Sequence, residues 1–198
     1  MPDSHIAIVL AAGASRRLGQ PKQLLEVDGE SLLVRAVSAA LATKPSQLVV
    51  ALGAEIEACT RALAHLPIRI VVVPKWALGM GTSLATVVAA ITDVHSAILV
   101  LGVDQPALDA SFLQRLVRSW HAQPLVPVAS AYAGILGIPA IFPAHYRARL
   151  STLSGDRGAR QLLRDTEDRV RQVRAPQLAL DIDKPEDWDR FQQARSDI

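Results

Sequence analysis

The sequence predicts a single α/β domain, a Rossmann-like three-layer sandwich in which a mostly parallel sheet lies between layers of helices. The chain has 198 residues, which is within the size range of one domain. Short, almost continuously apolar runs alternate along it with stretches of helical periodicity. No internal repeat, low-complexity tract or linker divides it. We therefore expect residues 1–198 to form one domain around one core.

The strands and helices are predicted in alternation. Runs rich in Val, Ile and Leu have the pattern of parallel strands that are buried on both faces. Each run is followed by a stretch of helical periodicity, and this βαβ order implies right-handed crossovers in a doubly wound sheet. The predicted strands are 6–11, 48–52, 68–73 and 97–103, and the predicted helices are 31–43, 54–66, 82–92 and 111–122.

The second part of the chain has a weaker pattern. Prolines at 124, 127, 139 and 143 interrupt the apolar residues, which favours irregular or edge strands within a less regular insert at about 124–156. The remaining predictions are a loop that enters a helix at 155–165, late strands at 170–173 and 178–182, and a closing helix at 185–195 with Pro185 in its first turn.

Composition and charge exclude several classes of protein. Half of the residues are hydrophobic and a fifth are charged, as in ordinary globular proteins. The formal net charge is only +2 and the basic residues are scattered, so nucleic acid is not an expected partner. Cys59 is the only cysteine, which excludes an internal disulfide and fits a reducing compartment. Without a signal-like segment or an apolar run of roughly 18 residues, we expect a soluble, cytoplasmic protein with no membrane partner.

The loop after the first predicted strand has the composition of a polyphosphate site. Residues 12–22 read A-G-A-S-R-R-L-G-Q-P-K, with two glycines, a hydroxyl and three cations. Glycine lets backbone N–H groups approach a phosphate, and Arg and Lys neutralise its charge. In open parallel sheets, ligands bind beyond the carboxyl ends of the strands, where this loop is expected to lie. A solvated basic turn is the alternative.

The spacing within this loop excludes two common nucleotide motifs. Lys22 is followed by Gln23, where a Walker A loop requires Ser or Thr. Gly13 is followed by Ala14 and Ser15, so the G-x-G-x-x-G spacing of dinucleotide-binding folds is absent. The loop therefore predicts a phosphate site of another type.

Carboxylates are predicted at the same edge of the sheet. Asp104 follows the fourth strand, and its hard oxygen ligands suit Mg²⁺, which commonly binds one or two carboxylates together with substrate phosphates. A turn residue or a helix cap is the alternative for Asp104. Asp181 and Asp183 end the predicted strand 178–182, and one of them would supply the second carboxylate. They could instead cap the helix that begins at Pro185.

A second segment with glycines follows the third strand. Residues 79–83 read G-M-G-T-S and lead into a predicted helix, whose free N–H groups and positive dipole end would favour an anionic ligand. The glycines permit close approach of a base or a ribose. The alternative is a flexible turn in which Thr82 or Ser83 caps the helix. Met80 and Trp76 are interpreted as packing residues.

These motifs together resemble a known family. Residues 10–22 read L-A-A-G-x-S-x-R-x-G-x-x-K, which is similar to the signature of nucleotidyltransferases that activate sugars and molybdopterin. The L-A-A-G form resembles the molybdenum cofactor cytidylyltransferases, whereas guanylyltransferase relatives usually have L-A-G-G. The likeness covers nearly the whole chain, through P-K-Q-L-L at 21–25, G-M-G-T-S-L at 79–84, D-Q-P at 104–106, G-D-R-G-A-R at 155–160 and D-I-D-K-P-E-D at 181–187.

The resemblance implies a fold of the nucleotide-diphospho-sugar transferase type. It also implies an Mg²⁺-dependent transfer of a nucleotidyl group, favouring CMP from CTP, to a molybdopterin-type acceptor, and a molybdenum enzyme could be a partner. Arg17, Lys22 and Asp104 would be catalytic, and Asp104, Asp181 and Asp183 would hold the metal. The implied nucleotide-binding residues are Leu10, Ala11, Ala12, Gly13, Ser15, Arg17, Lys22, Gly79, Gly81, Thr82 and Ser83, and the implied acceptor-binding residues are Gly155, Asp156, Arg157 and Arg160. Arg16 falls at a variable position and is not carried over.

One segment departs from the family pattern. Relatives usually carry basic residues and a Gly-His-Pro after the fifth strand, where this chain reads Y-A-G-I-L-G-I-P at 132–139. Ile135, Leu136 and Ile138 replace polar or basic positions, so the acceptor could be different, less charged or held elsewhere. Two other interpretations stay open: a GTP-using or sugar-1-phosphate nucleotidyltransferase, and a non-catalytic nucleotide-binding accessory protein of molybdenum enzymes.

Overall fold

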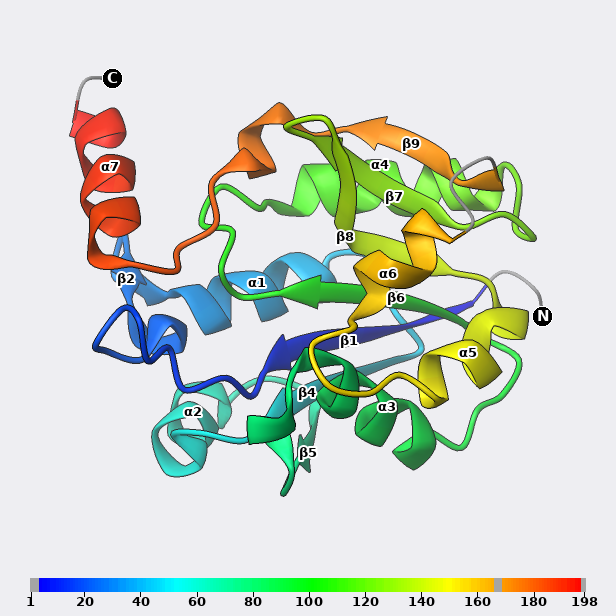
Figure 1. The fold of residues 1–198 in the computed structure, drawn as a ribbon, viewed down its shortest axis with the longest axis horizontal. Coiled ribbons are helices and arrows are strands. Elements are labelled where there is room, and N and C mark those ends of the chain that lie inside the picture. Colours follow the sequence, from blue (N-terminus) through cyan, green and yellow to red (C-terminus); the bar gives the residue numbers. More distant parts are fainter. Residues whose placement is uncertain (1–3, 166–168, 197–198) are drawn as a thin grey trace.

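The computed structural model describes residues 4–165 and 169–196, which form one α/β domain around a seven-stranded sheet (Figure 1). The strand order is β5-β4-β1-β6-β8-β7-β9. β8 is antiparallel to both of its neighbours, and the other pairings are parallel. The predicted class, a single α/β domain with a mostly parallel sheet, is confirmed.

The predicted parallel strands are present. They are β1 (His5–Ala11), β4 (Gln47–Leu52), β5 (Arg69–Val72) and β6 (Ala97–Gly102). All residues of β1 and β6 are buried, as expected for strands that are covered on both faces. β1 lies between β4 and β6, so the chain leaves the first strand at the point where the strand order reverses.

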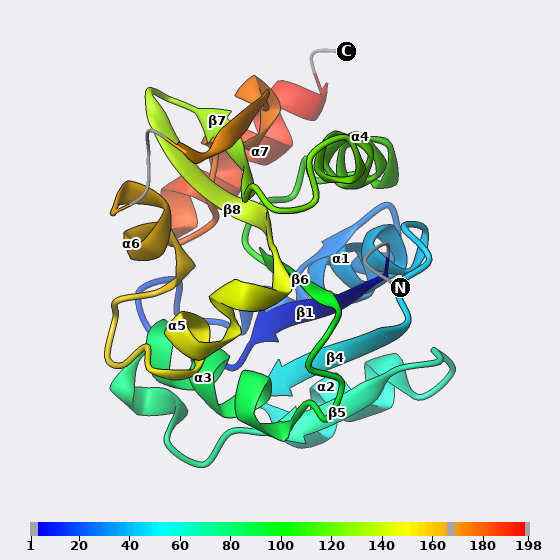
Figure 2. The same ribbon diagram turned by 90° about the vertical axis from the view of Figure 1, so that its right-hand side faces the viewer.

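Helices cover both faces of the sheet (Figure 2). One layer contains α1 (Leu32–Leu41), α2 (Ile56–Leu63) and α4 (Ala110–His121), and the other contains α3 (Met80–Ala90), α5 (Arg147–Ser151) and α6 (Ala159–Arg164). Two helices begin at side-chain caps. Ser31 Oγ accepts the Val34 N–H at 3.2 Å, and Asp109 Oδ1 accepts the Phe112 N–H at 2.7 Å. The predicted three layers are confirmed.

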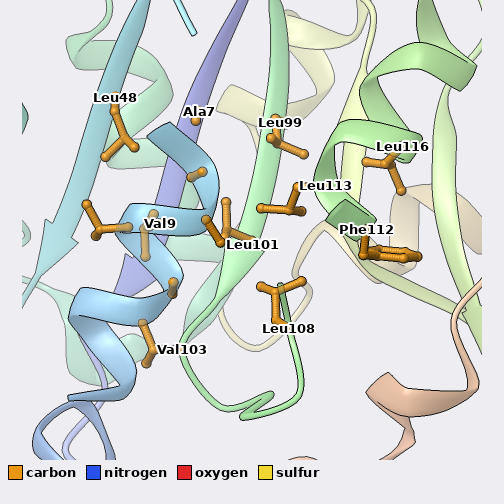
Figure 3. Close-up of a cluster of buried hydrophobic side chains, with 14 of the residues drawn as sticks. Ala7, Val9, Leu48, Leu99, Leu101, Val103, Leu108, Phe112, Leu113 and Leu116 are labelled. Carbon is orange, nitrogen blue, oxygen red and sulfur yellow. The ribbon is translucent and has the colours of Figure 1, made fainter. Parts of the chain in front are cut away.

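Two hydrophobic cores separate the sheet from its helical layers. Because side chains alternate along a strand, Val9 of β1 enters the core under α1, α2 and α4, whereas Ile8 enters the core under α3, α5 and α6. Figure 3 shows part of the first core, where Leu99 and Leu101 of β6 share a cluster with Leu113 of α4. All three leucines are fully buried, and each such side chain contributes roughly 1.5–3 kcal/mol of stability.

The segment 124–143 is more regular than predicted. β7 (Val128–Tyr132) and β8 (Ile135–Phe142) form a hairpin, and β8 lies inside the sheet between β6 and β7. The prediction of irregular or edge strands is therefore wrong for β8. Pro139 is tolerated there because the register with β7 shifts between Ala129 and Ser130, at a bulge, and no ladder hydrogen bond is required of a residue in a bulge.

Of the two predicted late strands, one is present in the structure and the other is absent. β9 (Arg171–Arg174) is present, as the outer strand beside β7. The predicted strand 178–182 is absent: the chain forms a 3-10 helix, η5 (Pro176–Ala179), and then runs without regular structure to α7 (Pro185–Ser196), the predicted closing helix. Pro176 has no N–H to continue a ladder, and the Ile182 N–H bonds the Asp104 carbonyl at 2.7 Å instead of a strand.

A small third core holds the C-terminal segment against the first loop. Ile182 is fully buried among Leu18 and Leu25, and Trp188 and Phe191 of α7 pack at its edge. The same cluster includes residues of a short hairpin, β2 (Glu26–Val27) and β3 (Glu30–Ser31). Chain segments 18–32 and 180–191, which are far apart in the sequence, therefore lie side by side (Figure 1).

The shorter elements complete the fold. Further 3-10 helices in the described part of the chain include η1 (Lys22–Leu24), η2 (Trp76–Leu78) and η3 (Ala144–Tyr146). Within residues 4–165 and 169–196, no helix is long and apolar enough to cross a membrane.

Candidate functional site

The loop after β1 opens at the topological switch point of the sheet. β4 and β6 flank β1, and the loops that follow β1 and β6 both leave from the carboxyl edge of these strands (Figure 1). In open parallel sheets, the crevice at this place is the usual ligand site. The two loops carry Lys22 and Asp104, so the predicted cation and carboxylate meet at one edge.

Ser15 closes the first loop into a compact turn. Its backbone has a left-handed φ of 51°, and its carbonyl accepts the Leu18 and Gly19 N–H groups at 3.0 and 3.2 Å. Its hydroxyl oxygen accepts the Lys22 N–H at 3.1 Å. The turn therefore folds back, and it places Lys22 beside the end of β1.

Gln23 lies beneath the loop and is only 1% exposed. Its Nε2 donates to the carbonyls of Ala11 at 2.9 Å and of Gly13 at 2.6 Å. The Ser15 hydroxyl donates to its Oε1 over a long 3.5 Å. Gln23 thus joins the start of the loop to the turn that carries Lys22.

Lys22 is the centre of a cluster of charges. Its Nζ lies 2.6 Å from Asp183 Oδ1 and 3.8 Å from Asp104 Oδ2, and its side chain is only 14% exposed. Arg17, which is largely exposed, places Nη2 at 3.0 Å from Asp183 Oδ2. The structure therefore brings together four of the predicted site residues, two cations and two carboxylates.

The ionisation of the carboxylates follows from these contacts. Burial acts to raise the pKa of Asp183, but the hydrogen bond and charge of Lys22, with help from Arg17, outweigh it and hold the pKa below its usual value. Burial raises the pKa of Asp181 to about 6, and the negative charge of Asp104 adds to the shift. For Asp181, a hydrogen bond from Gln105 and the charge of Lys22 act to lower the pKa but do not outweigh burial. The negative charge of these carboxylates would therefore favour the binding of an additional cation at this edge of the sheet.

The helix-capping alternative does not describe Asp183. Its carboxylate faces Lys22 and Arg17, whereas Asp187 Oδ2 accepts the N–H groups of Asp183 at 3.2 Å and of Lys184 at 3.0 Å. The first turn of α7 thus fixes the backbone that presents Asp183 to the cluster.

The carboxylates beside Lys22 could contribute to a divalent metal site only together with other ligands, such as substrate phosphates. In the described part of the chain, no three His, Cys, Asp or Glu side chains are grouped so as to hold a metal ion. Asp104 and Asp183 still provide two hard carboxylates around one ammonium group. Mg²⁺ is commonly held by one or two carboxylates with phosphates and water at its other positions. These residues fit that arrangement.

A cavity of about 420 Å³ opens beside the charges. This volume is within the range of small-molecule sites. Its walls come from the first loop, from the segment at the start of α3 and from the loop before α6. They are formed by Leu10, Ala12, Gly13, Ala14, Arg16, Arg17, Trp76, Ala77, Gly79, Met80, Ser83 and Asp156.

The glycines at the start of α3 serve close packing. A Cβ at Gly79 would lie 2.4 Å from the Gly155 backbone, and one at Gly81 would lie 2.4 Å from the Arg157 carbonyl oxygen. The Gly81 N–H donates to the Gly155 carbonyl at 2.8 Å, and Thr82 Oγ1 accepts the Gly155 N–H at 3.1 Å. The N–H of Gly81, predicted to be free for a ligand, is therefore bonded within the chain.

The family model that describes a MobA-like NTP transferase domain matches residues 7–172. The chain belongs to this family. The predicted kinship with molybdopterin-type nucleotidyltransferases is confirmed at this level, and the protein is an enzyme of the nucleotidyltransferase class.

Three relatives of this MobA-like transferase show the range of the family. Nicotine blue oxidoreductase of Paenarthrobacter nicotinovorans is 42% identical over 79% of this chain and 80% of its own. A probable molybdenum cofactor guanylyltransferase of Opitutus terrae is 31% identical over 92% of both chains. The crystal structure of Rv0371c from Mycobacterium tuberculosis in complex with manganese is 26% identical, covers 96% of this chain and 99% of its own, and has a TM-score of 0.80.

The acceptor residues implied by the resemblance occupy different places. Asp156 lines the cavity beside the first loop, on the side expected for the nucleotide. Gly155 and the Arg157 carbonyl pack against the start of α3. Arg160 is exposed in the first turn of α6, and its charge opposes the rise that burial causes in the pKa of Tyr132, to about 12.

The apolar segment 132–139 is largely part of the cores. Leu136 is 7% exposed and belongs to the core under α3, and Ile138 packs against the same core. Ile135 packs against the core on the other face. These residues stabilise the β7–β8 hairpin, and Ile135 and Leu136 also line a second cavity of about 370 Å³ together with Arg174.

The sequence analysis missed six residues of this site, of which Ala14 and Ala77 are small residues in the walls of the cavity. Arg16, Trp76 and Met80 line the cavity, although Arg16 was set aside as variable and the other two were interpreted as packing residues. Gln23 was noted only as a departure from the Walker motif and as part of the P-K-Q-L-L motif, without a role of its own. Its position directly after Lys22 was the available signal, because a polar residue between the cation and the apolar Leu24 and Leu25 must find buried partners.

Proposed function

We propose that this MobA-like transferase moves CMP from CTP to the phosphate of a molybdopterin-type acceptor. The observation that carries the proposal is the cluster in which Lys22 lies between Asp104 and Asp183, and which Arg17 connects to a cavity of about 420 Å³. Phosphoryl and nucleotidyl transfers depend on positioning and charge neutralisation, and this edge of the sheet supplies both.

The reaction requires no protein nucleophile. An oxygen of the acceptor phosphate attacks the α-phosphorus of CTP, the bond to the bridging oxygen breaks, and pyrophosphate leaves. When CTP binds, Lys22 and Arg17 would release Asp183 and pair with the phosphates of CTP, because a triphosphate offers more negative charge than one carboxylate. Asp183 would then be free for a cation.

A divalent metal is part of the proposal. Asp104 and Asp183 would hold Mg²⁺, and Asp181 would add negative charge nearby. Bound Mg²⁺ would neutralise the phosphates as pyrophosphate leaves. The manganese complex of Rv0371c supports a divalent ion at a fold of this kind.

The proposed substrates are inferred from the similarity of this chain to other proteins. The L-A-A-G sequence at 10–13 favours CTP. The Opitutus terrae relative supports a molybdenum cofactor acceptor, and its name, a guanylyltransferase, makes GTP the competing nucleotide. The lone Cys59 fits a reducing compartment, so we place the reaction in the cytoplasm.

The test is release of pyrophosphate by the purified protein with Mg²⁺, supplied with CTP or GTP and with molybdopterin or a sugar 1-phosphate. We expect release with CTP and molybdopterin. Release only with GTP would show that GTP, and not CTP, is the nucleotide substrate. Release only with the sugar phosphate would show that a sugar phosphate, and not molybdopterin, is the acceptor. Binding of both substrates without release would identify a non-catalytic accessory protein.

The 42% identity to nicotine blue oxidoreductase supports a second candidate, a redox activity. The first loop lacks the G-x-G-x-x-G spacing of dinucleotide-binding folds, which argues against a Rossmann-type nicotinamide site. Oxidation of NADH or NADPH by the purified protein, in the presence of a quinone-like dye, would favour this candidate. No oxidation, together with pyrophosphate release, would remove it.

A further inference from the structure

The start of the first loop turns its carbonyl oxygens into the protein. The carbonyls of Ala11 and Gly13 accept the two hydrogens of Gln23 Nε2, at 2.9 and 2.6 Å. Between them, the Ala12 carbonyl accepts the Ala54 N–H at 2.9 Å. Each of three successive peptide groups is therefore fixed by a hydrogen bond to its carbonyl, two of them from Gln23 and one from Ala54.

The N–H groups of these peptides consequently face the other way. In a trans peptide the N–H points opposite to the carbonyl, so the N–H groups of Ala12 and Ala14 point away from Gln23. Ala12, Gly13 and Ala14 all line the cavity. The N–H groups of Gly13 and Ala14 have no acceptor within the described residues, so they remain available to an anionic ligand.

Steric contacts alone would not hold the peptide groups at the start of the loop in this orientation. Gly13 is exposed, and a Cβ at this position would meet nothing within 4 Å. Glycine also has little intrinsic preference among backbone conformations. A rotation of the Gly13–Ala14 peptide would turn a carbonyl oxygen toward the bound phosphates, where it would repel them.

We propose that Gln23 is a positioning residue, which clamps the carbonyls of Ala11 and Gly13 so that the loop presents N–H groups to the phosphates of the nucleotide. The proposal rests on the proposed function only in taking the ligand to be a polyphosphate. Gln23 does not touch the ligand. A glutamine is suited to the task because its amide donates two hydrogen bonds from one nitrogen, which a carboxylate cannot do.

The experiment measures binding by isothermal titration calorimetry with two probes, inorganic tripolyphosphate and CTP, each with Mg²⁺. Gln23→Met keeps the length of the side chain and removes both donors, and Gln23→Glu keeps its shape and replaces the donors by a carboxylate. The matched control is Gln114→Met, because Gln114 Nε2 also donates to a carbonyl, that of Ala42 at 3.0 Å, far from the loop. Melting temperatures are recorded for all variants without ligand.

We expect both Gln23 variants to bind tripolyphosphate and CTP about tenfold more weakly or worse, a change of about 1.4 kcal/mol, and Gln114→Met to bind both normally. In turnover, the KM for the nucleotide should rise while the KM for the acceptor stays unchanged. Normal binding by either folded Gln23 variant, or equal weakening in Gln114→Met, would overturn the proposal. If the wild type binds tripolyphosphate but prefers GTP to CTP, the cytidylyl assignment fails and the role of Gln23 stands.

Discussion

At the level of single residues, Lys22 has two partners whose charges would otherwise repel each other. Asp104 and Asp183 both lie within 4 Å of its ammonium group, and the side chain is mostly buried. An ion pair in such a place has more effect than one at the surface, because water and salt screen it less. Lys22 therefore organises the site before any ligand arrives.

This arrangement predicts different effects for the cation and the carboxylate. Lys22→Ala should weaken CTP binding about tenfold or more, because its charge meets the phosphates in both the ground state and the transition state. Asp104→Asn should leave much of the binding but lower kcat about 100-fold, since a metal ligand matters most as charge develops on pyrophosphate. Titration calorimetry and a pyrophosphate assay measure the two effects. Wild-type turnover of Asp104→Asn at limiting Mg²⁺ would exclude this residue from the metal site.

His5 predicts a dependence of stability on pH. It is 3% exposed, and its Nε2 lies 2.9 Å from Thr43 Oγ1. Burial lowers its pKa to about 4, with a smaller contribution from His121. The folded state thus favours the neutral ring, whereas the unfolded chain takes up a proton near pH 6.5. The resulting stability is complete above about pH 6.5 and is lost as the pH falls toward 4.

We expect acidification from pH 7 to 4 to cost the wild type about 3 kcal/mol more than His5→Gln, whose amide does not titrate. Urea unfolding at a series of pH values measures the difference. His65→Gln, at an exposed histidine, is the control and should follow the wild type. If His5→Gln loses as much stability as the wild type does, other groups cause the acid sensitivity.

At the level of elements, the sequence predicted those strands and helices whose pattern is local. β1, β4 and β6 read as apolar runs because both of their faces are buried, whereas β5 is an outer strand and only partly buried. β8 was underestimated because Pro139 lies within it, and the bulge that accommodates Pro139 is formed by its pairing with β7. The sequence of β8 alone contains no sign of that partner.

The residues of the candidate site also differ in whether the local sequence could reveal their role. The cations and glycines of loop 12–22 were identified because their chemistry is contiguous in the sequence. The partnership of Asp183 with Lys22 and Arg17 was not, since it joins residues more than 160 positions apart through the packing of Ile182 and α7. The predicted strand 178–182 failed for a related reason. Its apolar residues are buried outside the sheet, Leu178 in the core under α1, α2 and α4 and Ile182 in the small third core.

The contact between α3 and the loop before α6 predicts contrasting glycine variants. Gly81→Ala would place a Cβ 2.4 Å from the Arg157 carbonyl, so the two elements must separate, and we expect a loss of about 1–3 kcal/mol. Gly13→Ala would meet no atom within 4 Å and should leave the stability of the free protein unchanged, yet weaken nucleotide binding by crowding the phosphates. Thermal unfolding with and without CTP separates these effects. Equal melting temperatures for Gly81→Ala and the wild type would contradict the close packing.

At the level of the whole molecule, the site exists only when the two ends of the described chain meet. The first loop supplies Lys22, and the segment before α7 supplies Asp183 after crossing the carboxyl edge of the sheet. A ligand that bridges these parts binds the folded state alone. CTP with Mg²⁺ should therefore stabilise the fold by about 2.7 kcal/mol at a hundredfold excess over its dissociation constant, and GTP should stabilise it less. Thermal shifts test this, and an equal shift with GTP would overturn the preference for CTP.

The division of the site between nucleotide and acceptor leads to a prediction about Arg157 and Arg160. Asp156 faces the nucleotide cavity, whereas Arg160 acts on Tyr132, the same phenol on which Asp104 and Asp181 act. We therefore expect Arg160 to meet the phosphate of the acceptor from the side of Tyr132. The side chains at 135, 136 and 138 are apolar and carry no charge that could meet that phosphate, so a neighbouring cation is required.

The double variant Arg157→Ala with Arg160→Ala should raise the KM for molybdopterin about tenfold and barely change the KM for CTP. Arg160→Ala alone should produce most of the effect, because Arg157 contacts the start of α3 through its backbone, which alanine keeps. Arg118→Ala, at an exposed position of α4 in the opposite layer, is the control. If the double variant uses molybdopterin as well as the wild type does, the arginines have a structural role, and a less anionic acceptor becomes the better hypothesis.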